Sequence, residues 1–122
     1  MIAHLSLAVS NYPGAKAFYE KALSPLGYRC NMEYEQAAGF NDGKNTDFWI
    51  TKKSSIHPTH VAFVAKSSKE VHEFYQAALA AGGKDNGGPG YRPDYWPGYY
   101  GAFVHDPDGN NIEAVWYDYS KK

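Results

Sequence analysis

Hydrophobic and polar positions alternate over residues 4–9 of the chain and again over residues 60–65. A period of two residues predicts a half-buried β-strand, because successive side chains of a strand point to opposite faces. A histidine, His4 or His60, begins each stretch and belongs to its more polar face. Apolar residues then recur at helical spacing over residues 15–23 and 71–79, so each predicted strand leads into an amphipathic helix.

Capping signals mark the start of both predicted helices. Ser10-Asn11 can cap the first helix, and Pro13 falls in its first turn, where a missing N–H does no harm. Ser67 and Glu70 form the S-x-x-E pattern of a capping box, which satisfies free backbone N–H groups. Gly82-Gly83 is a stop signal for the second helix.

The two halves of the chain repeat one another. Equivalent residues of the strand and the helix lie 56 positions apart throughout. A shared offset over two different elements is stronger evidence of duplication than either periodicity alone. The equivalent pairs are His4/His60, Phe18/Phe74, Tyr19/Tyr75, Ala22/Ala78, Leu23/Leu79 and Gly27/Gly83.

About three strand-like stretches follow each predicted helix. In the second half, residues 99–105 and 111–117 flank the sequence D-P-D-G, whose residue types favour a tight turn. In the first half, residues 36–40 and 46–50 flank the weaker turn sequence N-D-G. Both halves therefore have the order β-α-β-β-β.

This order predicts an α+β fold of two tandem βαβββ modules. The first module spans about residues 1–55 and the second about residues 56–122, and together they form a single domain over residues 1–122. Because each helix has one apolar face, we expect a cupped mixed β-sheet with the helices outside.

Composition and charge narrow the classes of function. Hydrophobic residues make up 43% of the chain, which favours a packed core, and the net charge of −1 with no basic face disfavours nucleic-acid binding. Neither a signal-peptide pattern nor a membrane-length apolar run is present, so we expect a cytoplasmic protein that does not bind a membrane. Cys30, the single cysteine, is expected to be a small buried residue and not a nucleophile.

Two imidazoles and two carboxylates converge if the modules pack about a pseudo-twofold axis. His4 and His60 hold equivalent strand positions. Glu113 and Asp47 each lie four residues after the turn glycine of their own half, which makes them expected counterparts. A carboxylate on an inward strand face is costly unless it is paired, and a dication relieves that cost better than two imidazoles. The pattern therefore predicts a divalent metal site.

At this point the sequence resembles a known family. The strand at residues 4–9, the tripeptide Ala17-Phe18-Tyr19 and above all D-P-D-G-N-N-I-E at residues 106–113 are similar to the vicinal oxygen chelate superfamily of glyoxalases, bleomycin resistance proteins and extradiol dioxygenases. The resemblance covers nearly the whole chain and implies paired βαβββ modules, usually a homodimer, with a metal in the cup. Carried over by position, the metal ligands are His4, His60 and Glu113. A fourth family position falls on Asp47, one methylene shorter than the glutamate often found in glyoxalases.

Simpler interpretations of these residues stay open. The two strand histidines can instead hydrogen-bond to their neighbours, and the two carboxylates can be solvated. His57 and His60, in the sequence H-P-T-H, do not form a local metal pair, because an odd separation on a strand places side chains on opposite faces. His72 on the second helix and His105 at a turn are expected at the surface.

The segment at residues 87–100, G-G-P-G-Y-R-P-D-Y-W-P-G-Y-Y, predicts a loop because glycine and proline break regular structure. One interpretation is a pocket rim with aromatic walls and an arginine that meets an anionic group. The other is a loop that plugs the cup or packs across a dimer interface. The candidate substrate-binding residues are Tyr91, Arg92, Tyr95, Trp96 and Tyr100.

The resemblance favours a metal-dependent lyase or isomerase of the glyoxalase-like class. A divalent Zn, Ni, Fe or Mn ion would chelate a small oxygenated substrate and stabilise an enolate-like oxyanion, and Asp47 or Glu113 would be the catalytic proton carrier. An extradiol-type dioxygenase with Fe(II) is an alternative. A non-enzymatic antibiotic-binding resistance protein is another, favoured by the aromatic loop and opposed by the metal ligands. The expected partners are a small-molecule substrate and a second copy of the chain.

Overall fold

The computed structural model describes residues 1–121 and contains the two modules that the repeat predicts. The first module consists of β1 (Leu5–Val9), α1 (Tyr12–Ala22), the 3-10 helix η1 (Ser24–Leu26), β2 (Arg29–Tyr34), β3 (Ala37–Asn41) and β4 (Thr46–Lys52). The second consists of β5 (His60–Val64), α2 (Ser68–Ala80), β6 (Lys84–Asp85), β7 (Gly90–Tyr91), β8 (Tyr99–His105), β9 (Asn111–Tyr117) and the 3-10 helix η2 (Tyr119–Lys121).

Each module forms its own mixed sheet. The strand orders are β1-β4-β3-β2 and β5-β9-β8-β6, and β7 also pairs with β8. The first strand of each module runs parallel to the last one, β1 to β4 and β5 to β9. Between α2 and β8, where a full strand was expected, only the two-residue strands β6 and β7 form. Glycine and proline interrupt the ladder there.

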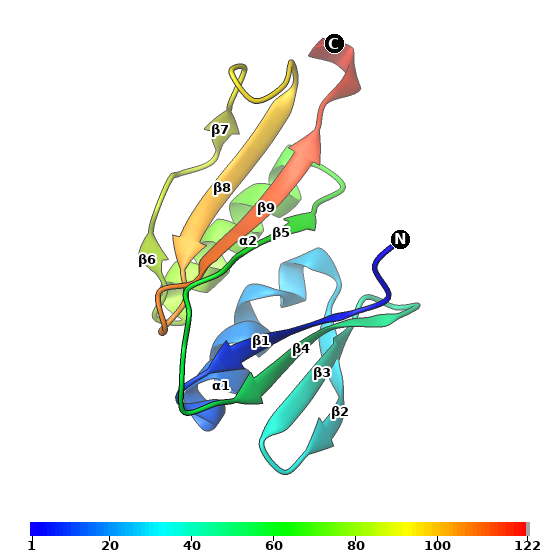
Figure 1. Ribbon diagram of the computed structural model, residues 1–122. Helices are drawn as coiled ribbons and strands as arrows, with labels where there is room; N and C mark the ends of the chain where they lie inside the picture. The colour runs from blue at the N-terminus through cyan, green and yellow to red at the C-terminus, as the bar shows by residue number, and fades with distance from the viewer. Residues whose placement is uncertain (122) are drawn as a thin grey trace.

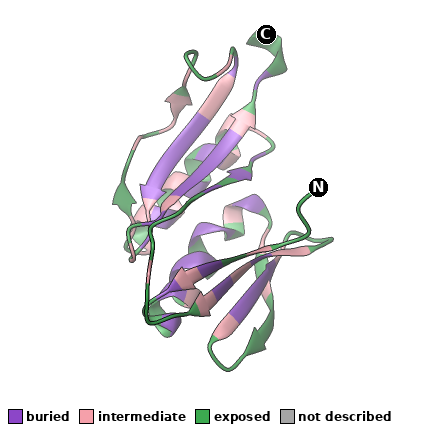
Figure 2. Ribbon diagram, in the orientation of Figure 1, coloured by how far each residue is buried: buried purple, intermediate pink, exposed green. Residues whose placement is uncertain are grey.

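Both helices lie on one side of the sheets, behind them in Figure 1, and α1 packs against α2. The strand residues that face the helices form the core, and Figure 2 shows them as buried stretches of the central strands, whereas β2 and the N-terminal segment are exposed. In β5 exposed and buried residues alternate strictly, which confirms the period of two read from the sequence. Neither helix among residues 1–121 has the length and apolar run needed to cross a bilayer.

The predicted caps are present at both helices. The Asn11 side chain accepts a hydrogen bond from the backbone N–H of Gly14 at 3.1 Å. The Ser67 hydroxyl accepts from the N–H of Glu70 at 3.1 Å, and the Glu70 carboxylate accepts from the N–H of Lys66 at 2.9 Å. These bonds satisfy N–H groups that a helix start leaves free, so the sequence signals correctly located both helix starts.

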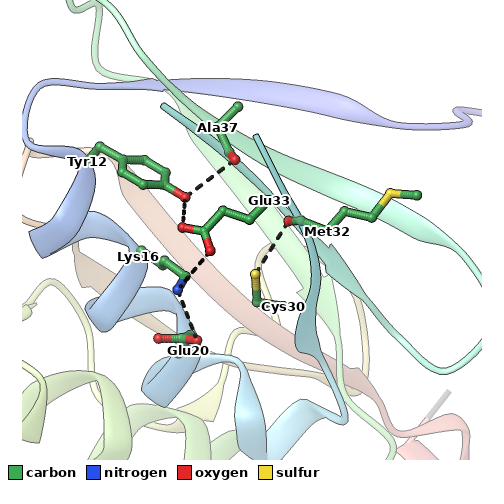
Figure 3. A network of polar contacts seen from close by, with 7 residues as sticks. All are labelled: Tyr12, Lys16, Glu20, Cys30, Met32, Glu33 and Ala37. Carbon is green, nitrogen blue, oxygen red and sulfur yellow. Dashed lines mark hydrogen bonds and ion pairs between the residues drawn. The ribbon is translucent and has the colours of Figure 1, made fainter. Parts of the chain in front are cut away.

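A polar network fixes α1 against the edge strand β2 (Figure 3). The Tyr12 hydroxyl donates to the Glu33 carboxylate at 2.6 Å, and the Lys16 ammonium lies 3.4 Å from the same side chain. The hydrogen bond from Tyr12, followed by the contact with Lys16, lowers the pKa of Glu33. Glu33 therefore stays ionised and keeps both partners at neutral pH.

Cys30 lies beside this network, where its thiol donates to the carbonyl of Met32 at 3.5 Å. Burial raises the pKa of the Cys30 thiol, which disfavours the thiolate form. A nucleophilic cysteine needs the opposite shift. The structure thus offers no activation of Cys30.

The D-P-D-G turn of the second module docks on the first module. Asp106 is only 4% exposed and accepts hydrogen bonds from the backbone N–H groups of Asp108 and Asn110. The Tyr19 hydroxyl of α1 donates to the same carboxylate, and the backbone N–H of Ser10 donates to Asp108 at 3.0 Å. The D-P-D-G residues predicted only a tight turn. The same turn also accepts the hydrogen bonds that join the second module to the first.

Replacing Tyr19 with phenylalanine should lower the free energy of unfolding by about 1–3 kcal/mol, because a buried carboxylate loses one of its donors. The matched control is Tyr75→Phe at the equivalent repeat position, where the hydroxyl donates to the exposed Asp85 at 2.9 Å. That control should change stability by less than about 0.5 kcal/mol. Urea unfolding of both variants measures the difference, and equal midpoints would show that the Tyr19–Asp106 contact does not stabilise the fold.

Candidate functional site

The uncovered face of the second sheet carries a buried carboxylate. Glu113 lies in the middle of β9, between its ladder partners Ala62 on β5 and Phe103 on β8. Its neighbours Ile112 and Ala114 belong to the core, so strand alternation points Glu113 away from α2. Glu113 is nevertheless only 1% exposed.

Two side chains hold the Glu113 carboxylate. The His60 Nε2 atom lies 2.7 Å from Oε1, and the Tyr99 hydroxyl donates to Oε2. Burial, followed by this hydrogen bond to Glu113, raises the pKa of Tyr99, so its phenol remains a proton donor at neutral pH. Partners of this kind fix the orientation of a carboxylate that ligates a metal.

Backbone geometry explains why these groups meet. His60 is the first residue of β5, which runs parallel to β9 with His60 opposite Asn111, two residues from Glu113 on the same face. A Cβ added at Gly101 would lie 3.4 Å from the Glu113 carboxylate. A larger side chain at this position would therefore contact the carboxylate, whereas glycine does not. The His60 side chain is about half exposed (54%) and can still receive a ligand.

His4 lies outside this cluster. It is exposed and precedes β1, which begins at Leu5. Among residues 1–121, no three His, Cys, Asp or Glu side chains gather closely enough to hold a metal ion. One chain therefore brings together two of the three predicted metal ligands, His60 and Glu113. Their nitrogen and oxygen donors suit a divalent transition metal, and only His4 is missing from the predicted ligand set.

The expected correspondence between Asp47 and Glu113 is wrong. In the first module Ser6 pairs with Trp49, whereas the equivalent Ala62 of the second module pairs with Glu113. Trp49 therefore holds the position of Glu113.

The error arises from the turn glycines. The same number of residues separates the equivalent ladder pairs Phe40–Phe48 and Val104–Ile112. The two turns nevertheless need a left-handed glycine at different points. Gly43 (φ 108°) follows Asp42 early in its turn, whereas Gly109 (φ 84°) ends D-P-D-G. Aligning the glycines therefore shifts the strands by two residues, and the true counterpart of Asp47 is Asn111.

Trp49 covers part of the open face of the first sheet. Its ring stacks on Tyr34 with centroids 5.9 Å apart and an angle of 14° between planes. It also lies over Gly39, where an added Cβ would come within 2.8 Å of the indole. An indole has no lone pair for a metal, so the first-module counterpart of Glu113 cannot be a metal ligand.

Asp47 lines a cavity of about 710 Å³ whose walls come from both modules, including Phe48 and Phe63. Its Oδ2 atom accepts a hydrogen bond from Tyr28 at 3.2 Å. Its Oδ1 atom is buried and has no hydrogen-bond partner within the described part of the chain. A carboxylate oxygen that is held in a cavity and left unpaired is suited to accept a proton.

The five candidate substrate-binding residues do not share one site. Tyr95 and Trp96 line a separate hollow with three tyrosines that the sequence analysis did not select. The Arg92 guanidinium donates to the carbonyl of Gly88 at 2.7 Å and lies over the Phe103 ring. The remaining two face other partners, since Tyr91 donates to Asp118 and Tyr100 contacts His72.

Known proteins share this architecture. The chain matches the glyoxalase/bleomycin resistance protein/dioxygenase superfamily over residues 1–114, and it belongs to that superfamily. No curated protein is significantly similar to it in sequence.

Three solved structures illustrate the similarity. A glyoxalase/bleomycin resistance protein from Albidiferax ferrireducens T118 is 26% identical, with a TM-score of 0.82 over 95% of this chain and 98% of that one. The lactoylglutathione lyase from Agrobacterium tumefaciens is 19% identical (TM-score 0.73, 95% and 92% covered). TioX from Micromonospora sp. ML1 is 15% identical (TM-score 0.75, 97% and 99% covered). At these low identities the last two show the fold alone.

Proposed function

We propose that the protein is a metal-dependent enzyme of the glyoxalase-like class that acts on a small oxygenated substrate as a lyase or isomerase. The observation that carries the proposal is the Glu113 carboxylate, which is buried on an uncovered sheet face and held by His60 and Tyr99. Keeping a carboxylate there costs free energy unless charge or hydrogen bonds compensate. The family to which the chain belongs includes glyoxalases.

The metal site is completed, in this proposal, by His4 from a second copy of the chain. Large apolar side chains are exposed on the two sheets, among them Val64 (68%) and Tyr34 (64%), and a dimer would cover such a surface. The donor set would be two imidazoles and one carboxylate. A metal bound there would act as a Lewis acid toward adjacent substrate oxygens.

Tyr99 and Asp47 would have separate tasks, and Asp47 lines a cavity to which His60 and Glu113 do not contribute. Tyr99 orients the Glu113 carboxylate through its hydrogen bond. Asp47, with one oxygen fixed by Tyr28 and the other unpaired, would take up and return a proton between adjacent carbons of the substrate. This assigns metal binding and proton transfer to different carboxylates.

An extradiol-type dioxygenase is the second candidate, and Trp49 is the observation that favours it. With Trp49 as the first-module counterpart of Glu113, the ligand set is two histidines and one carboxylate, which is the set of Fe(II) oxygenases. The antibiotic-binding alternative differs from both enzyme candidates because it requires no metal.

Metal analysis of protein purified without chelator separates these functions. Stoichiometric Zn, Ni or Mn with isomerisation of a 2-oxoaldehyde adduct supports the first candidate, and Fe(II) with catechol cleavage supports the second. If the protein is metal-free and EDTA does not change its ligand binding, both enzyme hypotheses are wrong and only the antibiotic-binding alternative remains.

Asp47→Ala should retain its metal while the turnover number falls by about 100-fold or more, which is the usual contribution of a positioned general base. Glu35→Ala, which removes an exposed carboxylate, should leave turnover unchanged. Steady-state kinetics with metal content measured on the same sample provide the test. Full activity of Asp47→Ala would remove Asp47 from the mechanism.

A further inference from the structure

Five aromatic side chains alone line a hollow of about 410 Å³ beside the second sheet. Neighbouring rings stand nearly perpendicular. The ring centroids of Tyr95 and Tyr99 are 5.2 Å apart at 85°, and those of Trp96 and Tyr117 are 5.5 Å apart at 89°. Rings at right angles form the walls of a box, unlike the flat stack of Trp49 on Tyr34. We call this feature the aromatic box, and it consists of Tyr95, Trp96, Tyr99, Tyr117 and Tyr119.

The aromatic box is held in shape by backbone hydrogen bonds. The N–H of Tyr99 donates to the carbonyl of Trp96 at 3.0 Å, and the N–H of Asp118 donates to the carbonyl of Gly98 at 2.8 Å. Gly98 has a positive φ of 88°, and an added Cβ would lie 2.1 Å from the carbonyl oxygen of Asp118. Only glycine fits there, so the loop that carries Trp96 is clamped onto the C-terminal segment. A ligand would meet rings that are already in place.

The surroundings of the aromatic box favour a positive charge. The Tyr99 hydroxyl donates to the Glu113 carboxylate, which makes the phenol ring richer in electrons. Within the described residues, no lysine or arginine lines the hollow. Ring faces carry negative potential, and the indole of a tryptophan attracts cations best.

We propose that the aromatic box binds an alkylammonium group, meaning a tertiary or quaternary amine carried by a small molecule. Methyl groups on nitrogen would fill the hollow, and the positive charge would face the rings. A neutral group of the same shape would gain only from apolar burial, so the charge should determine selectivity. Tyr99 connects the aromatic box to Glu113 through its hydrogen bond. That the bound cation is part of the substrate rests on the proposed function. Binding of an alkylammonium group by the box does not depend on it.

The test uses choline and its uncharged isostere 3,3-dimethylbutan-1-ol with EDTA-treated protein. The chain has three tryptophans, and two-dimensional NMR resolves their indole N–H signals. Choline should shift the Trp96 signal saturably, and the isostere should bind at least about tenfold more weakly. Equal binding of the two compounds, or no shift with either, would overturn the proposal.

Variants locate the binding and separate it from the metal. Trp96→Leu should weaken choline binding about tenfold, as expected for loss of one strong ring face. Tyr75→Leu, which removes a half-buried aromatic ring on α2 outside the hollow, should leave it unchanged. Because the protein is treated with EDTA, a failure of the metal site does not affect this result. Unaltered choline binding by Trp96→Leu would show that the aromatic box is not the site.

Discussion

Replacing His4 with alanine should remove bound divalent metal from the purified protein, although one chain does not bring His4 to His60 and Glu113. Loss of an outer-shell partner alone weakens metal affinity about 10- to 100-fold, so loss of one of three direct ligands should weaken it by at least about 100-fold. Because His4 is exposed, the thermal midpoint of the metal-free protein should not change. Elemental analysis after gel filtration and competition with a chelator measure the effect.

The other histidines provide the controls. His57 is exposed and outside the strands, and His72 lies on α2, where it contacts Tyr100. His57→Ala and His72→Ala should therefore keep wild-type metal content. A His4→Ala protein with normal metal would mean that the site is built without this residue, and the proposed joint site would then be abandoned.

The fold was predictable because its local signals agree with one another. The alternation at β5, the caps at Asn11 and Ser67 and the D-P-D-G turn each indicate the element that forms. The missing full strand between α2 and β8 is the exception. There the local chemistry of glycine and proline overrides the repeat, and two short strands form in its place.

The candidate site was less predictable, because it depends on strand register. Periodicity assigns Glu113 to a face, but it does not show which residue of the next strand lies beside it. Tyr99 was missed for this reason, although Tyr117, its ladder partner, shares the face of Glu113. The false match of Asp47 to Glu113 has the same origin, since a glycine marks the conformation of a turn and not the register of its strands.

The docking of the turn also escaped sequence reasoning. Tyr19 and Asp106 are 87 positions apart, and each has a sufficient local explanation, as a helix core residue and as a turn residue. Their contact nevertheless joins the turn of the second module to α1 of the first. The helices pack together, and the sheet faces that carry Glu113 and Trp49 point away from them.

Mixing two inactive variants should restore metal binding, if each site draws on two chains. His4→Ala and Glu113→Ala should each lose metal as pure proteins. After subunit exchange, a mixed dimer has one site in which both defects coincide and one intact site. Random pairing makes about half of the dimers mixed, so metal should return to about one quarter of the wild-type content.

The matched control mixes His60→Ala with Glu113→Ala. These two residues lie 2.7 Å apart within one module of the same chain, so no pairing of the two variants yields an intact site. Metal should stay at the background level. If instead His4 reached His60 and Glu113 within its own chain, neither mixture would regain metal, because every chain carries one defect. Recovery in the first mixture and its absence in the second would thus identify a site shared between two copies.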